Sequence, residues 1–494
     1  MERNLIYNIH LFESLGKYYL FDVNTDRIVA LDKETYFCLK TGKVETDYQN
    51  DKIISLEKDG LLKKRWVEET EHPLTEYAGF YLSGKLCRMT FQITQDCNLR
   101  CDYCIYSGDY QNRTHSKLEM DFETVKKGLD YLLAHSCQSK NILIGFYGGE
   151  PLLKFDLIKK SVAYADKLFE GKPVSYQITS NITLLTEEMM DFLVEHGFNV
   201  LFSFDGPEEI HDKNRKFKGN GKGTFGVVIP KLYEFKNKYP DFFETNVSVN
   251  TVLDSENSFL AVDRYFRSQD LFLDKQISSN MVDMKYRKIT KKTNGKFYEE
   301  YNYELFKTFL LRLGWLHNYK ESVLLKEKMF QIVKSRVGKE NGTRREVPLK
   351  SHRSGPCIPG IDRLFVTAEG KLYPCERVSE SSCATCIGSI ESGIDLLAVQ
   401  RLMNIEKLSS EKCRKCWAYF NCLVCASFLD DVETGSLSAK GMEESCHTCK
   451  EIIEDNFKNY LFLESHGYNF LENQRRRCFI CGISQGLGIR WFEN

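Results

Sequence analysis

Runs of apolar and β-branched residues alternate with amphipathic stretches in the middle of the chain. The apolar runs predict strands at residues 86–94, 141–147, 174–179, 199–204 and 246–253. The stretches between them predict helices, which include residues 122–134, 157–170, 187–196 and 227–238. Strands that alternate with helices of this length indicate right-handed βαβ units around a parallel sheet. Because ligands of such sheets bind at the carboxyl ends of the strands, we expect the functional residues there.

A different pattern flanks this region. Tyr18-Tyr-Leu-Phe-Asp-Val, a turn and Arg27-Ile-Val-Ala-Leu predict a hairpin, and a helical stretch that ends at Gly60 follows it. A hairpin with short helices indicates a compact, winged-helix-like domain over residues 1–75. After the alternating region, residues 284–296 are basic and predict a solvated loop. Two helices, at 298–313 and 323–337, then form a bridge over residues 300–350.

Composition and charge exclude several classes of function. The chain has 494 residues, 42% of them hydrophobic, which is enough for about two or three domains. Its net charge of -1 provides no electrostatic footprint for nucleic acid or an anionic membrane, so we expect neither as a partner. No apolar run has the length of a membrane span, and the first residues lack a signal-peptide pattern. We therefore expect a cytoplasmic protein.

The chain has 18 cysteines, which indicate metal sites rather than disulfides in a reducing compartment. Cys97, Cys101 and Cys104 follow the strand at 86–94, so they lie on a loop at its carboxyl end. Three thiolates on one loop can hold three irons of a [4Fe-4S] cluster and leave the fourth iron open. The alternative is a structural zinc site, which needs four closed ligands, and no Cys or His beside the motif supplies the fourth.

The spacing CxxxCxxC, with Tyr103 before the third cysteine, resembles the cluster motif of radical S-adenosylmethionine (SAM) enzymes. The resemblance implies an α/β fold with a partial (β/α)6, TIM-like barrel over residues 86–300. It also implies SAM-binding residues where successive strands end. These are Tyr103, Gly148, Gly149, Glu150, Pro151, Ser180, Asn181, Ser203, Asp205 and Arg215. By the same resemblance, Gly148-Gly-Glu-Pro cradles the methionine amino group, Asn181 reaches the ribose and Arg215 pairs with the carboxylate. Taken singly, these residues are also typical of ordinary turns and caps.

The last third of the chain holds twelve of the cysteines. Its pattern resembles the SPASM extension of peptide-modifying radical SAM enzymes, which holds two auxiliary [4Fe-4S] clusters, here over residues 351–455. By that resemblance one cluster is held by Cys413, Cys416, Cys422 and Cys446. The other has three ligands, Cys357, Cys375 and Cys425, and an open iron that a substrate cysteine can bind as thiolate. The chain departs from the family in the two-residue gap between Cys422 and Cys425, where three residues are usual, and in having no further cysteine in residues 351–356.

Several side chains in this region keep open roles. Each remaining cysteine can be a further cluster ligand, an electron shuttle, a zinc ligand or simply an exposed thiol. These cysteines are Cys383, Cys386, Cys449, Cys478 and Cys481. Glu376 stands where sulfatase-maturating relatives have a carboxylate proposed as a base, so the resemblance makes it a candidate catalytic residue; the alternative is an ordinary exposed glutamate. Residues 456–494 are expected to be a tail.

The resemblances together imply a peptide maturase. The winged-helix-like domain resembles domains whose strand edge accepts a leader peptide as an added strand, although a simple cap is the alternative. In the family, a reduced cluster transfers an electron to SAM, the carbon–sulfur bond breaks, and the 5′-deoxyadenosyl radical removes a hydrogen from a substrate carbon. We therefore expect a thioether-forming enzyme that acts on a cysteine-rich precursor peptide with a leader and takes electrons from flavodoxin or ferredoxin. The alternatives are an anaerobic sulfatase-maturating enzyme, which makes formylglycine, and a non-catalytic iron-sulfur redox or sensor protein that binds a peptide.

Overall fold

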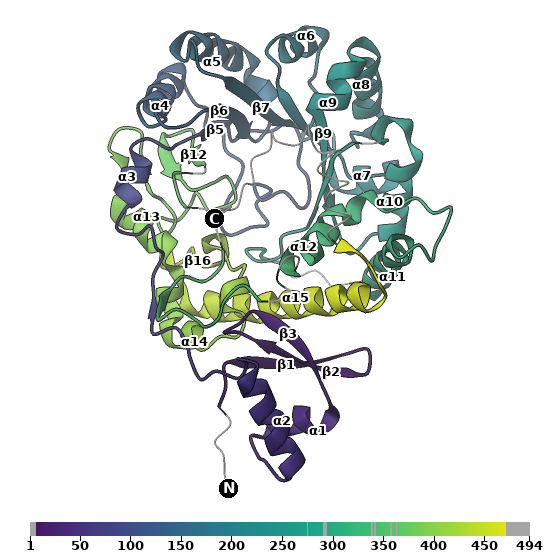
Figure 1. The fold of residues 1–494 in the computed structure, drawn as a ribbon. Helices are drawn as coiled ribbons and strands as arrows, with labels where there is room; N and C mark the ends of the chain where they lie inside the picture. The colour runs from purple at the N-terminus through teal and green to yellow at the C-terminus, as the bar shows by residue number, and fades with distance from the viewer. Residues whose placement is uncertain are drawn as a thin grey trace.

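The computed structural model describes most of the chain, namely residues 6–273, 275–289, 294–336, 339, 342–355, 358–361 and 363–470. The largest sheet within these residues has ten strands in the order β10-β9-β8-β7-β6-β5-β12-β13-β14-β15. Figure 1 shows this sheet curving around the centre of the molecule, with helices on its outer side. None of the described helices combines the length and the apolar composition of a membrane span.

Six parallel strands form the curved part of the sheet. They are β5 (Arg88–Thr94), β6 (Ile142–Gly148), β7 (Val174–Ser180), β8 (Asn199–Ser203), β9 (Val247–Leu253) and β10 (Ile277–Met281). The helices outside it are α4 (Phe122–Ala134), α5 (Phe155–Leu168), α6 (Glu187–Glu195), α7 (Glu208–Asn214), α8 (Phe225–Lys238), α9 (Pro240–Asn246) and α10 (Phe259–Ser268). Each long helix buries one apolar stripe against the strands, as α4 does with Val125, Leu129 and Leu132. This confirms the predicted α/β fold and partial (β/α)6 barrel.

The N-terminal region is a three-stranded antiparallel sheet followed by two helices. Its elements are β1 (Ile9–Ser14), β2 (Lys17–Asp22), β3 (Arg27–Leu31), α1 (Lys33–Thr41) and α2 (Asp47–Lys58). The predicted hairpin is β2–β3, and β1 adds a strand that the sequence pattern did not reveal. Leu20 packs under α1 and α2 on one face, while Phe21 on the other face contacts Trp417 and Phe457. Both faces of this sheet are therefore covered.

The C-terminal region is built onto the barrel. β12 (Leu364–Val366) pairs in parallel with β5, and β13 (Lys371–Tyr373), β14 (Gly388–Ser389) and β15 (Gly393–Ile394) extend the sheet outward. The helices α11 (Gly295–Arg312) and α12 (Lys326–Arg336) form the predicted bridge. The later helices are α13 (Leu396–Met403), α14 (Ser410–Arg414) and α15 (Ala439–Ser465). The shorter elements are β4 (Glu69–Thr70), α3 (Ala78–Leu82), β11 (Lys350–Ser351), β16 (Asp430–Asp431) and β17 (Ser436–Leu437).

Two segments differ from expectation. α15 continues past residue 455, where the tail was expected to begin, because Phe457, Tyr460 and Leu461 are buried. Figure 1 shows α15 running between the barrel and the N-terminal sheet. The predicted solvated loop begins with a packed stretch, since Tyr286 is buried and donates to the carbonyl oxygens of Ser427 and Asp430.

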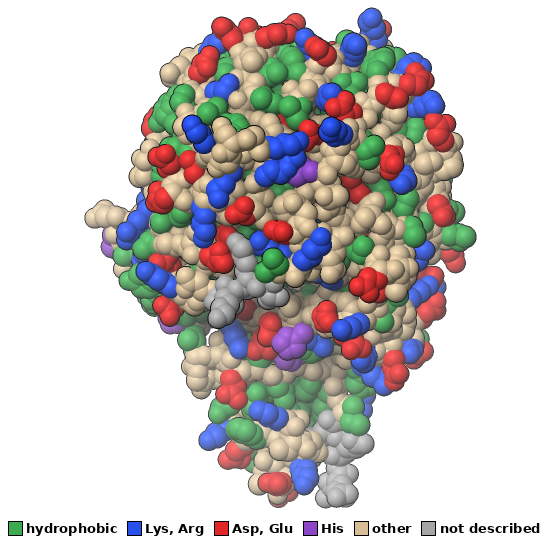
Figure 2. Space-filling view, turned by 180° about the vertical axis from the view of Figure 1, so that it is seen from behind, with side chains coloured by type: hydrophobic (Ala, Val, Ile, Leu, Met, Phe, Trp, Pro, Cys, Tyr) green, Lys and Arg blue, Asp and Glu red, His purple; other side chains and the backbone are tan. Residues whose placement is uncertain are grey.

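The charged surface is mixed in sign. On the face drawn in Figure 2, basic and acidic side chains are interspersed, as a net charge near zero suggests. Most ion pairs on the surface are exposed and contribute little to stability. The buried ion pair at Asp26 is different.

Asp26 joins the N-terminal sheet to the helical bridge. Its side chain is buried, and its Oδ1 lies 2.9 Å from Nη1 of Arg336. Its Oδ2 lies 3.2 Å from Nζ of Lys339 and accepts a hydrogen bond from Thr343. Burial opposes ionisation, but Lys339, Arg336 and Arg344 outweigh it and hold the pKa of Asp26 below its usual value. The β2–β3 turn is therefore attached to the rest of the protein by a buried carboxylate.

We expect Asp26→Asn to lower the free energy of unfolding by about 3 kcal/mol, because it leaves Arg336 buried without its counter-charge. Since the pKa of Asp26 is lowered on folding, its contribution is complete above the ordinary pKa of an aspartate and disappears as the pH falls through the lowered value. Denaturation midpoints of wild type and variant should therefore converge in acid. Glu346→Gln, which removes the half-exposed partner of Arg65, is the control and should cost less than about 1 kcal/mol. Equal losses from the two substitutions would contradict this account.

Candidate functional site

The three cysteines of the first motif share one ordered loop after β5. Cys97 and Cys101 are buried and Cys104 is partly buried, in a cluster with Leu99 and Tyr103. The loop is held by backbone hydrogen bonds from Arg100 to Lys216 and from Asp102 to Asn214. Leu99 donates its N–H to Sγ of Cys97 at 3.3 Å. The fold therefore brings the predicted thiols together with a backbone donor already directed at one sulfur.

The chemistry of this loop fits an iron cluster. Burial raises the pKa of Cys101 to about 12 and also raises the pKa values of Cys97 and Cys104, so the bare thiols are protonated at neutral pH. A bound metal cluster reverses this preference and takes the sulfurs as thiolates. Among the described residues, no group of three His, Cys, Asp or Glu side chains is placed to hold a single metal ion. The case for iron therefore rests on the donor set of three clustered sulfurs.

Gly148 and Gly149 press the end of β6 against the cluster loop. Gly148 has a φ of +145°, and a Cβ there would lie 2.1 Å from the carbonyl oxygen of Thr94. A Cβ at Gly149 would lie 2.0 Å from the carbonyl oxygen of Asp96. The N–H groups of Gly149 and Glu150 donate to these same two oxygens, at 2.7 and 2.9 Å. Only glycine allows the two backbones to approach this closely.

Glu150 joins this turn to the end of β7. Its buried carboxylate accepts from the hydroxyl of Ser180 and the N–H of Asn181, each at 2.7 Å. Burial raises the pKa of Glu150 to about 6. Asn181 in turn donates to Oδ1 of Asn98 at 3.0 Å and lies 3.7 Å from Sγ of Cys97. Pro151 begins a buried 3-10 turn, Pro151–Lys154. Six predicted SAM-binding residues, Gly148, Gly149, Glu150, Pro151, Ser180 and Asn181, thus form one group beside the cluster loop.

Asp205 and Arg215 contact the cluster loop at Tyr103 and Cys101. Nε of Arg215 lies 3.2 Å from Oδ2 of Asp205, which also accepts from the hydroxyl of Tyr103. Nη1 of Arg215 lies 3.9 Å from Sγ of Cys101. The guanidinium that was predicted to pair with the SAM carboxylate is thus already paired with Asp205, and its contact with SAM stays a prediction. Ser203 ends β8 beside Asn250 of β9.

His211 supports Asp205 and was not predicted. Its Nδ1 accepts from the N–H of Asp205 at 3.3 Å, and its Nε2 lies 2.9 Å from Oγ1 of Thr224. Burial, with the charge of Arg215, lowers the pKa of His211 to about 2, so the ring is neutral. Its place soon after Asp205 was visible in the sequence, but its burial was not.

Four cysteines of the C-terminal region line one cavity. Its volume is about 260 Å³, and its thiols are those of Cys413, Cys416, Cys422 and Cys446. α14 and the loop after it carry the first three, and α15 carries the fourth. This is the set that the sequence pattern grouped in one auxiliary cluster. Cys375 is buried, which raises its pKa to about 11, and it lies within electrostatic reach of Cys425. Cys357 lies outside the described residues.

The side chains with open roles have separate surroundings. Cys449 is buried, and its Sγ accepts from the N–H of Leu423 at 3.2 Å. Cys383 is exposed beside the carbonyl oxygen of Gly435, and Cys386 is 3.4 Å from that of Gly388. Cys478 and Cys481 lie outside the described residues.

Glu376 is ion-paired. Its Oε1 lies 3.3 Å from Nη1 of Arg363. Burial opposes ionisation of Glu376, but Arg363 and its neighbours outweigh this effect and lower its pKa. A carboxylate with a lowered pKa is a weaker base than a free glutamate, so a role in deprotonation stays a prediction.

Glu380 forms a buried junction that the sequence did not predict. Its Oε2 accepts from Gln92 of β5 at 2.6 Å, and its Oε1 accepts from Tyr106 at 2.7 Å. Nε of Arg113 lies 3.4 Å from the same Oε1. The junction joins the barrel, the segment after Cys104 and the loop that follows Cys375. Glu380 is far from Gln92, Tyr106 and Arg113 in the sequence, and the four residues carry no shared motif.

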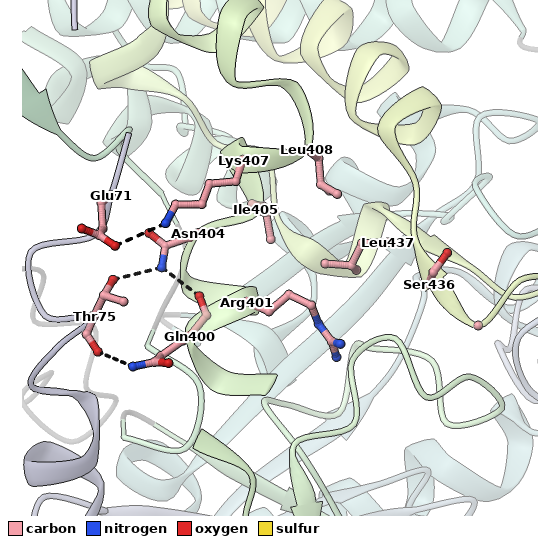
Figure 3. Close-up of a pocket in the computed structure, with 11 residues that line it drawn as sticks. Glu71, Thr75, Gln400, Arg401, Asn404, Ile405, Lys407, Leu408, Ser436 and Leu437 are labelled. Carbon is pink, nitrogen blue, oxygen red and sulfur yellow. Dashed lines mark hydrogen bonds and ion pairs between the residues drawn. The ribbon is translucent and has the colours of Figure 1, made fainter. Parts of the chain in front are cut away.

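A larger cavity, of about 670 Å³, has no cysteine in its lining. Figure 3 shows that five of its polar side chains are turned toward one another, namely Glu71, Thr75, Gln400, Asn404 and Lys407. Gln400 donates to the carbonyl oxygen of Thr75 at 2.8 Å, Asn404 donates to Oγ1 of Thr75, and Lys407 pairs with Glu71. These bonds fasten the linker before the barrel to α13 and the turn after it. We therefore assign this cavity to a seam between segments rather than to the chemistry.

The cysteine loop lies in a segment that matches a known protein family. Residues 91–257 match the model of the radical SAM superfamily. They form a radical SAM domain. The matched segment contains the cysteine loop, the Gly148–Gly149 turn and the Asp205–Arg215 pair. Domains of this superfamily use SAM and a [4Fe-4S] cluster, which agrees with the three sulfurs described above.

The chain is similar to an uncharacterized protein over part of its length and to anaerobic sulfatase-maturating enzymes over more of it. An uncharacterized protein of Methanocaldococcus jannaschii is 37% identical over 162 residues, which is 33% of this chain and 53% of that protein. The chain thus spans about half the length of that relative. A cysteine-type anaerobic sulfatase-maturating enzyme of Clostridium perfringens is 25% identical over 373 residues, 72% of this chain and 92% of that enzyme. The structure of native anSMEcpe with bound AdoMet matches with a TM-score of 0.56 at 22% identity, over 76% of this chain and 99% of that one, and so shows the same fold.

We expect Gly149→Ala to raise the dissociation constant for SAM at least tenfold, which corresponds to 1.4 kcal/mol. The added Cβ cannot lie 2.0 Å from the carbonyl oxygen of Asp96, so the end of β6 must move away from the cluster loop. Equilibrium binding of SAM to the anaerobically reconstituted protein measures the effect. Gly226→Ala, at an open position on α8, is the matched control and should bind SAM normally. Unchanged affinity in Gly149→Ala would refute the proposed close packing.

Proposed function

We propose that this protein is a radical SAM peptide maturase that forms thioether crosslinks in a ribosomally made, cysteine-rich peptide. The observation that carries the proposal is the pairing of a radical SAM domain with a C-terminal region in which four cysteines line one cavity. In the same region the buried Cys375 lies within electrostatic reach of Cys425. The domain boundaries at residues 1–75, 86–300, 300–350 and 351–455 belong to this proposal, as does a cytoplasmic location.

The residues of the radical SAM domain take defined roles in it. Cys97, Cys101 and Cys104 hold the first cluster, and the Gly148–Gly149 turn supplies close backbone contact for SAM. Cluster and SAM together supply a one-electron cleavage that produces a group able to remove hydrogen from carbon. The buried pair of Asp205 and Arg215 keeps Tyr103 and Cys101 in place, and the Glu150 carboxylate holds Ser180 and Asn181.

The overall change on the peptide is a loss of two hydrogens. The carbon-bound hydrogen atom, with its electron, leaves to the deoxyadenosyl group of SAM, which gives 5′-deoxyadenosine and methionine. The thiol proton passes to a base. Formation of the sulfur–carbon bond releases one electron, which passes to an auxiliary site. Reduced flavodoxin or ferredoxin supplies the electron that opens SAM. Two observations support an inner auxiliary site, at Cys375 and Cys425, for the peptide thiol. Cys375 lies within electrostatic reach of Cys425, and the buried cation of Arg113 lies within electrostatic reach of both Cys104 and Cys375.

The N-terminal sheet is the proposed site for the leader of the peptide. Within the described residues β1 and β3 each pair only with β2, so each has an outer edge without a neighbouring strand. An extended leader can add to such an edge through its backbone. The attachment at Asp26 and the contact of Phe21 with Phe457 keep this sheet at a fixed position relative to the C-terminal region.

We expect co-expression without oxygen with a cysteine-rich precursor peptide to lower the mass of the peptide by two hydrogens per crosslink, with loss of one alkylatable thiol each time. Mass spectrometry of the peptide measures both changes. Cys425→Ala should abolish them, because it removes a proposed ligand of the inner auxiliary site, while Cys137→Ala, which removes an exposed thiol outside the site, should not. Crosslinking that survives Cys425→Ala would contradict the proposed inner site.

Sulfatase maturation is the second candidate. The match to the Clostridium perfringens enzyme over 92% of its length favours it. The absence of a further cysteine in residues 351–356 and the N-terminal sheet favour the peptide maturase. Incubation with a peptide that carries a sulfatase cysteine separates the two candidates, because formylglycine is an aldehyde that reacts with a hydrazide probe. Aldehyde formation, with no thioether in any precursor peptide, would assign the protein to sulfatase maturation.

A further inference from the structure

A buried guanidinium lies against the four-cysteine cavity. Arg353 is 2% exposed and is among the largest fully buried side chains in the described residues. Its Nη1 donates to Sγ of Cys422 at 3.3 Å and to the carbonyl oxygen of Ser354 at 3.2 Å. Its Nη2 has no hydrogen-bond partner within the described residues. The positive charge is thus directed at one of the four sulfurs and is shielded from water.

The position of this guanidinium is set by its neighbours. Its Nε faces the buried carboxylate of Glu406, 3.6 Å from Oε2. Gly355 covers the other side, where a Cβ would lie 2.7 Å from Nη1 of Arg353 and 3.3 Å from the carbonyl oxygen of Cys422. The side chain therefore has little freedom to turn away from the sulfur. An arginine that only balanced Glu406 would not need its other nitrogen at Cys422.

A second thiol lies beside the same cysteine. Cys449 is on α15 and 7% exposed, and its Sγ accepts from the N–H of Leu423, the residue next to Cys422, at 3.2 Å. Because the N–H of Leu423 occupies the acceptor side of this thiol, its S–H is left to donate on the side of Cys422. Cys449 is not among the cysteines that line the cavity.

We propose that Arg353 and Cys449 donate hydrogen bonds to Cys422 as a ligand of the auxiliary cluster in the four-cysteine cavity, and that they raise the reduction potential of that cluster. The inference rests on the proposed function only in placing a cluster at Cys413, Cys416, Cys422 and Cys446, and it does not depend on the peptide substrate. In this account Cys449 is a donor to a ligand, not a ligand.

Reduction adds one negative charge to the cluster, and a nearby positive charge or hydrogen-bond donor stabilises that charge. Hydrogen bonds to the sulfurs and the local charge are among the factors that set the potential of an iron-sulfur cluster. A positive group in a buried, low-dielectric site interacts far more strongly with the added electron than one in water does. Partners that donate to a ligand also tune a metal site without touching the metal. Arg353 combines charge and hydrogen bond, so its effect should exceed that of the neutral Cys449 thiol.

A redox titration followed by electron paramagnetic resonance tests the proposal. The full chain is used with Cys97→Ala, Cys101→Ala and Cys104→Ala in the background, so that signals come only from the C-terminal clusters. Arg353→Gln should keep the iron and sulfide of the background protein and shift one midpoint potential to a more negative value. Arg353→Lys should recover most of the shift, and Cys449→Ala should show a smaller negative shift. Lys415→Gln removes the same charge from an exposed side chain between Cys413 and Cys416 and should leave the potential unchanged.

The measured potentials and iron contents distinguish a failure of this inference from a failure of the proposed cluster. Arg353→Gln with full iron and the potential of Lys415→Gln would overturn the inference. If Arg353→Gln loses iron, Cys449→Ala decides: a negative shift supports the proposal, and an unchanged potential overturns it. Loss of iron from Cys449→Ala would also overturn it, because Cys449 would then be a ligand. If Cys413→Ala costs the background protein no iron, the four-cysteine cluster of the proposed function fails, and this inference fails with it for a different reason.

Discussion

The arrangement of this site depends on one close contact between two backbones. The carbonyl oxygens of Thr94 and Asp96, at the start of the cysteine loop, accept from the N–H groups of Gly149 and Glu150 at the end of β6. The two chains approach so closely that neither Gly148 nor Gly149 has room for a Cβ. Because Glu150 then reaches Ser180 and Asn181, the ends of three neighbouring strands become a single hydrogen-bonded unit. The loop that carries the three thiols is anchored to this unit, so its position follows from the strand register of the barrel.

The C-terminal region depends on a second contact with the same strand. β12 pairs with β5, which places the loop carrying Cys375 beside the barrel mouth. The Glu380 side chain, which is 9% exposed, then joins Gln92, Tyr106 and Arg113, and this network fixes the loop against the segment after Cys104. Buried charges of this kind are costly unless they are paired, so the junction defines one relative position of the two regions. The four-cysteine cavity lies further from the barrel, between α14 and α15, with Arg353 on its wall.

The sequence revealed those parts of the structure that depend on local pattern. The strands from β5 to β9 were predictable because their residues are apolar over short runs, and the helices between them because their apolar residues fall on one face. β10 was not predictable, since Ile277-Ser-Ser-Asn-Met has one buried residue and three polar residues in a row. The cysteine groups were visible as spacings. In contrast, the contacts of Glu380 with Arg113 and of Arg353 with Cys422 join residues with no common motif, and only the folded chain brings them together. The same holds for Arg215. The sequence pattern made both Arg215 and Asp205 candidate SAM-binding residues, but it did not predict that they pair with each other.

The central claim is that Cys97, Cys101 and Cys104 hold a cluster that opens SAM. The most direct measurement is the amount of 5′-deoxyadenosine formed by the anaerobically reconstituted protein with dithionite and SAM, without any peptide. The account predicts 5′-deoxyadenosine from the wild-type protein and from Cys137→Ala, and none above background from Cys101→Ala. Equal formation by Cys101→Ala and wild type, or none by wild type when its iron content is full, would contradict it.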